Sequence, residues 1–468
     1  MQPDATAEAA RPVPLSRIPV ADHSTIAKGT SAGLLTSWLA RARSSSFVRA
    51  VAAIAGGTAV AQALTVLAAP ILTRLYTPED MGVYGLYLSF VGVASVAITL
   101  RYEVAIVAAH SEQHAIALTR ACLVLSVLIG ALAALTLELL RHLNLFEYGT
   151  LPTWSPWLAM IALVGVGWGT SLRYFAVRQG AFGLVGRFTI TQAMARVAGQ
   201  LLFSPIGSGG LITGEALGRI FGLRAFAGYL RSVRAPTPVC PVLSAYSSYP
   251  LVQLPSGILN ALAGLALVPV FATLFGTAVA GQLALVQRII GLPMALVGTA
   301  IADVFYGQAA QLARANPEAL RPYLLRTMLR LALFSVPFAL LLFLAGPGLC
   351  RLVFGQSWSP AGEMLAILAP WMAMRFPVSS VSRVIFLSRY QSLKLAFDLA
   401  SLLLVFVLWR LALGEWKATL ALYSMGSALL YVFYGWILAL SASPRLLQRV
   451  CQSTSENSTP AIRDADVP

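Results

Sequence analysis

Charged residues are scarce in this sequence. Asp, Glu, Lys and Arg make up 11% of its 468 residues, whereas 58% are hydrophobic, and a soluble protein carries about 25% charged residues. Apolar runs of about 20 residues recur along almost the whole chain. They do not alternate as the strands of a membrane barrel do, and within a bilayer only helices or closed barrels satisfy their own backbone hydrogen bonds. The sequence therefore predicts an all-α integral membrane protein.

Sequence motifs for metal-dependent, nucleotide-driven or hydrolytic chemistry are absent. There is no Walker-type phosphate loop, no HExxH motif and no recognisable arrangement of Ser, His and Asp. The four cysteines are scattered and show no metal-ligand spacing: Cys122, Cys240, Cys350 and Cys451. We therefore expect no metal site, no cofactor and no enzymatic activity.

About twelve membrane spans are predicted, separated by short turns rich in Gly and Pro. They lie near residues 48–74, 82–109, 115–140, 153–178, 184–204, 211–230, 251–275, 282–308, 327–345, 361–387, 393–413 and 417–440. Most arginines and lysines fall in alternate loops, and basic loops normally stay on the cytoplasmic side. This rule places both chain termini in the cytoplasm. It also accounts for the net charge of +15 without a nucleic-acid partner.

An internal repeat divides the predicted spans into two sets of six. Residues 68–84 align without gaps with residues 267–283, so that Pro70 pairs with Pro269 and Gly82 with Gly281. Internal repeats with substrate handled between them are typical of transporters. We expect a disordered cytoplasmic tail at 1–46, six-helix lobes at 47–230 and 251–441, a cytoplasmic linker at 231–250 and a second tail at 442–468.

Five charged residues lie deep within predicted spans. Arg196, Arg219 and Arg375 are the deepest, and Arg288 lies in the outer half of its span. Glu215 is four residues from Arg219, a spacing that lets two side chains pair on one helix face. Charges at membrane depth usually face a cavity or a partner, and arginine stays charged and can bind phosphate with two donors. These four arginines and one glutamate therefore predict a cationic cavity for an anionic substrate.

Arg101 and Glu103 belong to the stretch LRYEVAIV, which follows a long uncharged run. Residues two apart on a helix point to opposite faces, so we expect no ion pair between these two. We expect Arg101 to face the cavity at its inner mouth and Glu103 to meet a neighbouring helix. The candidates for ion coupling or charge pairing are Glu103, Glu215, Asp303 and Asp398.

The stretch ILTRLYTPEDMGVYGLY, followed by RYEVAIVAA, resembles the Wzx-type oligosaccharide flippases of the multidrug/oligosaccharidyl-lipid/polysaccharide exporter superfamily. The resemblance covers about residues 47–440. It implies two six-helix lobes around a central cavity. It also implies alternating access that flips an undecaprenyl-diphosphate-linked oligosaccharide from the cytoplasmic to the periplasmic face of the bacterial inner membrane. The implied partners are this glycan, the lipid bilayer and polysaccharide polymerase or ligase machinery, and the product would be lipopolysaccharide O-antigen, capsule or exopolysaccharide.

Three other functions remain as alternatives. A drug or small-cation exporter of the same superfamily would need acidic residues deep in the first five spans, which have none at mid-depth. A membrane glycosyltransferase or polymerase would need catalytic carboxylates and a sizeable extramembrane domain, and a non-transporting scaffold would not explain the deep arginines. The candidate substrate-binding residues are therefore Arg101, Arg196, Arg219, Arg288 and Arg375.

Overall fold

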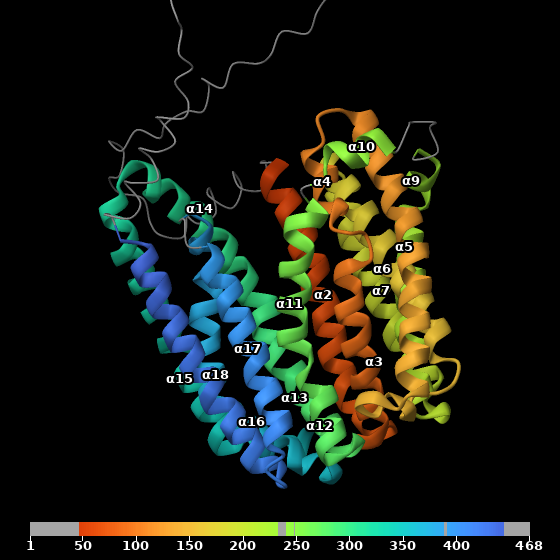
Figure 1. Ribbon diagram of the computed structural model, residues 1–468, viewed down its shortest axis with the longest axis vertical. Helices are drawn as coiled ribbons and strands as arrows, with labels where there is room; N and C mark the ends of the chain where they lie inside the picture. Colours follow the sequence, from red (N-terminus) through yellow and green to blue (C-terminus); the bar gives the residue numbers. More distant parts are fainter. Residues whose placement is uncertain (1–45, 233–239, 248, 388–390, 444–468) are drawn as a thin grey trace, which may run out of the picture. The chain divides into compact units, whose positions relative to one another are not determined.

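The chain folds into helices joined by short turns, as the computed structural model shows for residues 46–232, 240–247, 249–387 and 391–443 (Figure 1). No strand occurs in these ranges, which confirms the predicted all-α fold class. The two predicted tails lie almost entirely outside the described residues, and so does the middle of the predicted linker, residues 233–239.

The described part of the first half contains six long helices and several short ones. Their bounds are α2 (Ser46–Leu75), α3 (Pro78–Ala97), α4 (Tyr102–Ala108), α5 (Glu112–His142), η1 (Leu145–Thr150), α6 (Ser155–Arg178), α7 (Phe182–Leu202), η2 (Ser204–Ile206), α8 (Ser208–Gly222), η3 (Leu223–Phe226), α9 (Ala227–Ser232) and α10 (Cys240–Ala245). A capping box formed by the sequence TPED begins α3: the Asp80 amide donates to the Thr77 hydroxyl at 3.1 Å, and Pro78 follows the cap.

The second half repeats this organisation with more breaks. Its elements are η4 (Tyr249–Gln253), α11 (Leu254–Leu265), α12 (Leu267–Phe275), α13 (Thr277–Pro293), η5 (Met294–Gly298), α14 (Thr299–Ala315), α15 (Pro317–Phe354), η6 (Gln356–Trp358), α16 (Ser359–Val381), η7 (Ser382–Leu387), α17 (Gln391–Leu411) and α18 (Trp416–Ser441). The turn between α12 and α13 depends on Gly276, whose φ of +85° is unfavourable for other residues.

Nine helical segments in the described ranges are long and apolar enough to cross a membrane. The three predicted spans that are not among them correspond to α7, α8 and α13, with 21, 15 and 17 residues. These three helices carry Arg196, Arg219 and Arg288. α8 and α13 are too short to count as spans by themselves, and all three helices line an internal cavity, where polar side chains are tolerated.

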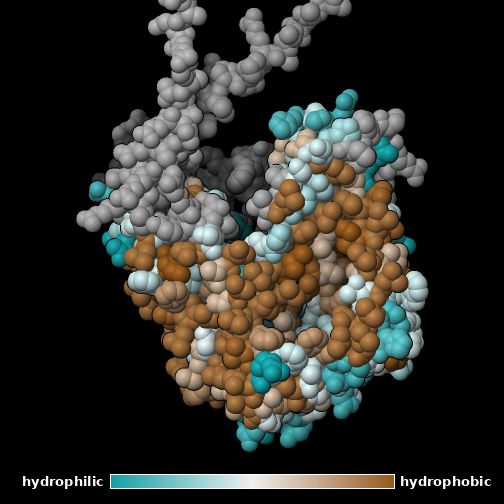
Figure 2. Space-filling model, viewed as in Figure 1, coloured by the Kyte–Doolittle hydropathy of each residue, from teal (hydrophilic) through white to brown (hydrophobic). Residues whose placement is uncertain are grey.

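The outward faces of the long helices are strongly apolar. Leu132 of α5, Leu344 of α15 and Leu352 of α15 have exposed fractions of 63%, 70% and 78%. Figure 2 shows a broad hydrophobic face that lies between hydrophilic residues at the two ends of the helices. Exposed leucines in this number would be unfavourable in water, whereas lipid solvates them. The surface therefore fits the multi-pass membrane protein predicted from the sequence.

The two halves meet where α3 packs along α13 (Figure 1). Buried residues from both helices belong to one hydrophobic core, which also includes Phe271 of α12 and Trp358 of η6. The Trp358 indole donates to the carbonyl oxygen of Thr73, the third-last residue of α2, at 2.8 Å. These contacts close the end of the helices at which the α2–α3 and α12–α13 turns lie.

The predicted span at 82–109 is not one continuous helix. It breaks between α3 and α4, where Leu100 and Arg101 adopt left-handed backbone conformations with φ of 51° and 67°. The break turns the Arg101 side chain toward Glu103, and the Nη1–Oε1 distance is 3.6 Å. The prediction that these two residues form no ion pair is therefore wrong, because it assumed regular helical rotation through this segment.

Candidate functional site

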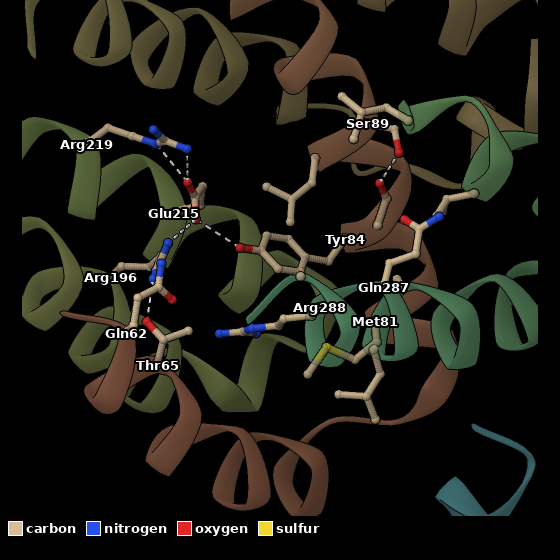
Figure 3. A pocket seen from close by; sticks show the side chains of 17 residues that line it. Gln62, Thr65, Met81, Tyr84, Ser89, Arg196, Glu215, Arg219, Gln287 and Arg288 are labelled. Carbon is tan, nitrogen blue, oxygen red and sulfur yellow. Dashed lines mark hydrogen bonds and ion pairs between the residues drawn. The ribbon is translucent and has the colours of Figure 1, made fainter. Parts of the chain in front are cut away.

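A cavity of about 450 Å³ lies between the two halves, where α3, α7 and α8 approach α13 (Figure 3). Its wall combines aliphatic side chains with charged and polar ones, and Arg196, Glu215 and Arg219 lie together on one side. We call it the cationic cavity and define it by six residues: Thr65, Tyr84, Arg196, Glu215, Arg219 and Arg288.

Glu215 is the central acceptor of the cationic cavity. Its carboxylate accepts from Arg219 Nε at 2.8 Å and from the Tyr84 hydroxyl at 2.9 Å, and Arg196 Nη1 lies 3.9 Å away. The glutamate is only 1% exposed. A buried carboxylate requires several charge-assisted partners of this kind to offset its lost hydration, so Glu215 acts as the counter-ion that holds two arginines in place.

Two arginines keep donors available for a ligand. Arg196 donates from Nη2 to the Thr65 hydroxyl at 2.8 Å, but its buried Nε has no hydrogen-bond partner. Arg288 projects from α13 into the same space and makes no hydrogen bond or ion pair with any residue in the described ranges (Figure 3). Unpartnered guanidinium donors beside a cavity are poised to receive an anion.

The charge of the cationic cavity is unbalanced. Among the described residues, three guanidinium groups and one carboxylate line it, so three positive charges minus one negative charge leave an excess of two. An excess of this kind inside a membrane protein is costly unless water or a counter-ion enters. The cavity is therefore suited to a dianionic group and unsuited to a free cation.

A second cavity, of about 420 Å³, adjoins the first, and the two share Leu265, Gln287 and Gly291 in their walls. It lies in the second half of the chain and contains Arg375, which stacks on the ring of Trp371 with the guanidinium carbon 4.7 Å from the ring centroid. Tyrosine and serine side chains provide much of the remaining wall.

A third cavity, of about 380 Å³, is almost entirely apolar. It is formed by α3, η1, α12 and α17 together with the ends of α5 and α11, and its wall includes Phe146 and Trp409, whose ring centroids lie 5.6 Å apart. The third cavity shares Ser89 with the cationic cavity and Leu265 with both others. Leu265, the last residue of α11, thus lies where the three spaces meet.

The structure places the sequence-predicted residues in three groups. Arg196, Arg219, Arg288 and Glu215 come together in the cationic cavity. Arg375 and Asp398 line the second cavity.

Arg101 and Glu103 line none of the three cavities. Arg101 lies instead against α11, where a Cβ on Gly257 would be 2.9 Å from its Nη2. The side chain of Asp303 lies outside the described part of the chain.

Several functional candidates were not found from the sequence. Tyr84 and Thr65 anchor the charges of the cationic cavity, and Lys394 and Asn260 both bind Asp398. Lys394 is four residues before Asp398 on one helix, so the spacing rule that identified Glu215 and Arg219 would have found this pair as well. Contacts between distant helices, such as that of Asn260 with Asp398, leave no such local signal. No cluster of His, Cys, Asp and Glu able to hold a metal occurs among the described residues.

The fold is shared with known membrane transporters. The lipid II flippase MurJ in an inward closed conformation aligns with a TM-score of 0.63 and 12% identity, covering 86% of this chain and 92% of that one. The eukaryotic MATE transporter AtDTX14 aligns with a TM-score of 0.57 and 13% identity, covering 88% of this chain and 100% of that one. An inward-facing multidrug resistance MATE family transporter of the MOP superfamily aligns with a TM-score of 0.52 and 15% identity, covering 85% of this chain and 96% of that one. No curated protein matches the sequence.

Residues 71–363 match a family described as "Polysaccharide biosynthesis protein". The matched region runs from the end of α2 to the start of α16 and includes all six residues of the cationic cavity except Thr65. This match agrees with the resemblance seen in the stretch ILTRLYTPEDMGVYGLY. The chain belongs to the polysaccharide biosynthesis protein family and has the all-helical fold of the MOP superfamily transporters.

Proposed function

We propose that this protein flips an undecaprenyl-diphosphate-linked oligosaccharide from the cytoplasmic to the periplasmic face of the bacterial inner membrane. The observation that carries the proposal is the cationic cavity, in which Arg196, Arg219 and Arg288 surround a single buried carboxylate. A diphosphate that links a lipid to a sugar carries one negative charge on each phosphate. Its charge would balance the excess of two positive charges in the cavity.

Arginine suits this task for two reasons. Its guanidinium group stays charged inside a membrane protein, and its parallel N–H groups match the oxygens of a phosphate. Arg288 and the Nε of Arg196 have no protein partner in the described ranges, so a diphosphate would gain hydrogen bonds without breaking existing ones. Glu215 would keep Arg219 and Arg196 oriented while the ligand enters and leaves.

Alternating access is the transport mechanism that we propose. The contact between α3 and α13 and the Trp358–Thr73 hydrogen bond close one end of the cavity region. In the predicted topology this end faces the periplasm. A transport cycle would separate α3 from α13 at this end and bring the two halves together at the opposite one.

The charge of the cavity disfavours the rival functions. A drug or cation exporter would have to place a cation beside an excess of positive charge, which is electrostatically unfavourable. We also propose that the flipped glycan becomes part of O-antigen, capsule or exopolysaccharide. A polymerase or ligase would receive it on the periplasmic side. The family match to polysaccharide biosynthesis supports these proposals.

The experiment that tests this function is made in cells. The gene is deleted, and the undecaprenyl-linked glycan is located on either face of the inner membrane by its accessibility to an added glycan-modifying enzyme. We expect the glycan to accumulate on the cytoplasmic face and surface polysaccharide to be lost. Unchanged surface polysaccharide with no accumulation would overturn the proposal.

A further inference from the structure

The second cavity has a chemistry of its own. Its wall carries three charged side chains, Arg375, Lys394 and Asp398, together with hydroxyl groups from both α16 and α18. It shares part of its wall with the cationic cavity. A ligand whose diphosphate occupies the cationic cavity would therefore extend its next chemical group into the second cavity.

One of the two positive charges in the second cavity is already neutralised. Lys394 Nζ lies 2.5 Å from Asp398 Oδ1, and Asn260 Nδ2 donates to the same oxygen at 3.0 Å. Asp398 is 2% exposed, so it faces its partners and has little surface left for a ligand.

Arg375 is different, because no carboxylate within the described ranges pairs with it. Its guanidinium group rests on the face of Trp371, which orients the group without neutralising it. For the residues that the structure describes, two positive charges minus one negative charge leave an excess of one in the second cavity. The cavity can therefore accept one further anionic group.

The hydroxyl groups in the wall of the second cavity indicate the chemistry of the rest of the ligand. Ser379 and Ser401 donate to helix carbonyl oxygens, at 2.6 Å and 2.9 Å, so their oxygens remain free to accept hydrogen bonds. The Tyr434 hydroxyl is buried at the cavity wall with no partner. Buried hydroxyl groups normally have partners, and a ligand rich in hydroxyl groups would supply them.

We propose that the second cavity binds a sugar that carries a carboxylate, with the carboxylate on Arg375 and the sugar hydroxyls on the serine and tyrosine hydroxyls. This inference rests on the proposed flippase function and adds a substrate class to it: an acidic saccharide close to the diphosphate. The anionic charges of the ligand, two on the diphosphate and one on the sugar, would then match the separate charge excesses of the two adjoining cavities.

The test uses the full-length protein in proteoliposomes with two synthetic polyprenyl-diphosphate disaccharides. The two probes differ at one carbon of the first sugar, which bears either a carboxylate (glucuronic acid) or a hydroxymethyl group (glucose). We expect wild type to flip the acidic probe about tenfold faster than the neutral probe, as one charge-assisted hydrogen-bond pair allows. Arg375→Gln should abolish this preference by slowing the acidic probe far more than the neutral probe, and Arg375→Lys should restore part of it.

Arg410→Gln is the matched control, because Arg410 is an exposed arginine on α17 outside both cavities. Retained flipping of the neutral probe by Arg375→Gln shows that this variant is folded. Equal rates for both probes in wild type, or an undiminished preference in Arg375→Gln, would overturn the acidic-sugar assignment and leave the flippase function standing. Failure of wild type to flip either probe would contradict the flippase function and this inference with it.

Discussion

Gly82 of α3 and Gly281 of α13 lie against each other so closely that neither position has room for a side chain. A Cβ on Gly82 would be 1.9 Å from the carbonyl oxygen of Thr277, and a Cβ on Gly281 would be 1.8 Å from that of Pro78. The sequence repeat pairs Gly82 with Gly281, and the same offset pairs Pro78 with Thr277. The two halves of the chain therefore meet through equivalent residues at the closed end of the cavity region.

Replacing either glycine with alanine should open this contact. Backbone atoms cannot move aside as a flexible side chain can, so we expect Gly82→Ala or Gly281→Ala to destabilise the closed arrangement by about 1–3 kcal/mol. Thermal unfolding in detergent would measure the loss. The accessibility of a cysteine placed at Thr73 to a membrane-impermeant thiol reagent would report the opening.

Gly348→Ala is the control for these variants. A Cβ at Gly348 would meet no atom within 4 Å, and alanine is favoured over glycine in a helix by about 1 kcal/mol. Its thermal midpoint should therefore stay equal or rise. If Gly82→Ala behaves like Gly348→Ala in both assays, the close contact does not hold the end closed.

Glu215 should behave as a structural counter-ion and not as the coupling site for an ion. Glu215→Ala would leave Arg196 and Arg219 facing each other without a carboxylate, and breaking a buried ion pair costs about 3–5 kcal/mol. Glu215→Gln keeps the shape of the side chain and one hydrogen-bond acceptor, so it should lose less stability than Glu215→Ala. Thermal unfolding of the two variants in detergent measures this order.

Transport measured across a pH series gives the second readout for Glu215. We expect Glu215→Gln to lower the transport rate without changing its pH profile. A pH profile that is flattened in Glu215→Gln alone would instead assign proton coupling to this carboxylate.

Arg101 and Glu103 provide a test of the break between α3 and α4. Glu103 is 6% exposed and also accepts a hydrogen bond from Thr99. Removing its arginine partner by Arg101→Ala leaves a buried carboxylate with fewer donors, at a cost of roughly 1–3 kcal/mol. Adding Glu103→Gln removes the unpaired charge, so the double variant should recover thermal stability.

Transport by the same variants separates two roles for Arg101. If the double variant recovers stability and also transports normally, Arg101 serves the fold at this break. A double variant that is stable but inactive would show that the guanidinium group itself acts on the substrate, as the sequence-based expectation has it.

Much of the fold could be predicted from local features of the sequence. Apolar runs of membrane length identify the long helices, and the four-residue spacing of Glu215 and Arg219 correctly indicates their ion pair. The repeat that pairs Gly82 with Gly281 identified two equivalent positions, although not their contact. Each of these signals depends on residues close together in the sequence or on a constant offset.

Other features depend on long-range packing or on backbone breaks. Nothing in the sequence separates Arg375, which lines the second cavity, from Arg288, which lines the first, because the difference arises from how α16 and α13 pack. The ion pair of Arg101 with Glu103 depends on left-handed conformations at two non-glycine residues. Such conformations cost about 1–3 kcal/mol each and are stabilised only by surrounding tertiary structure.

The most direct test of the central claim is the flipping rate of a polyprenyl-diphosphate-linked saccharide by purified protein in proteoliposomes, compared between wild type, Arg288→Gln and Arg74→Gln. Arg288 lines the cationic cavity without a partner in the described ranges, whereas Arg74 is exposed at the end of α2. We predict that wild type and Arg74→Gln flip the lipid at similar rates and that Arg288→Gln is slower by about tenfold or more. Flipping by Arg288→Gln at the wild-type rate would contradict the assignment of the cationic cavity as the diphosphate site.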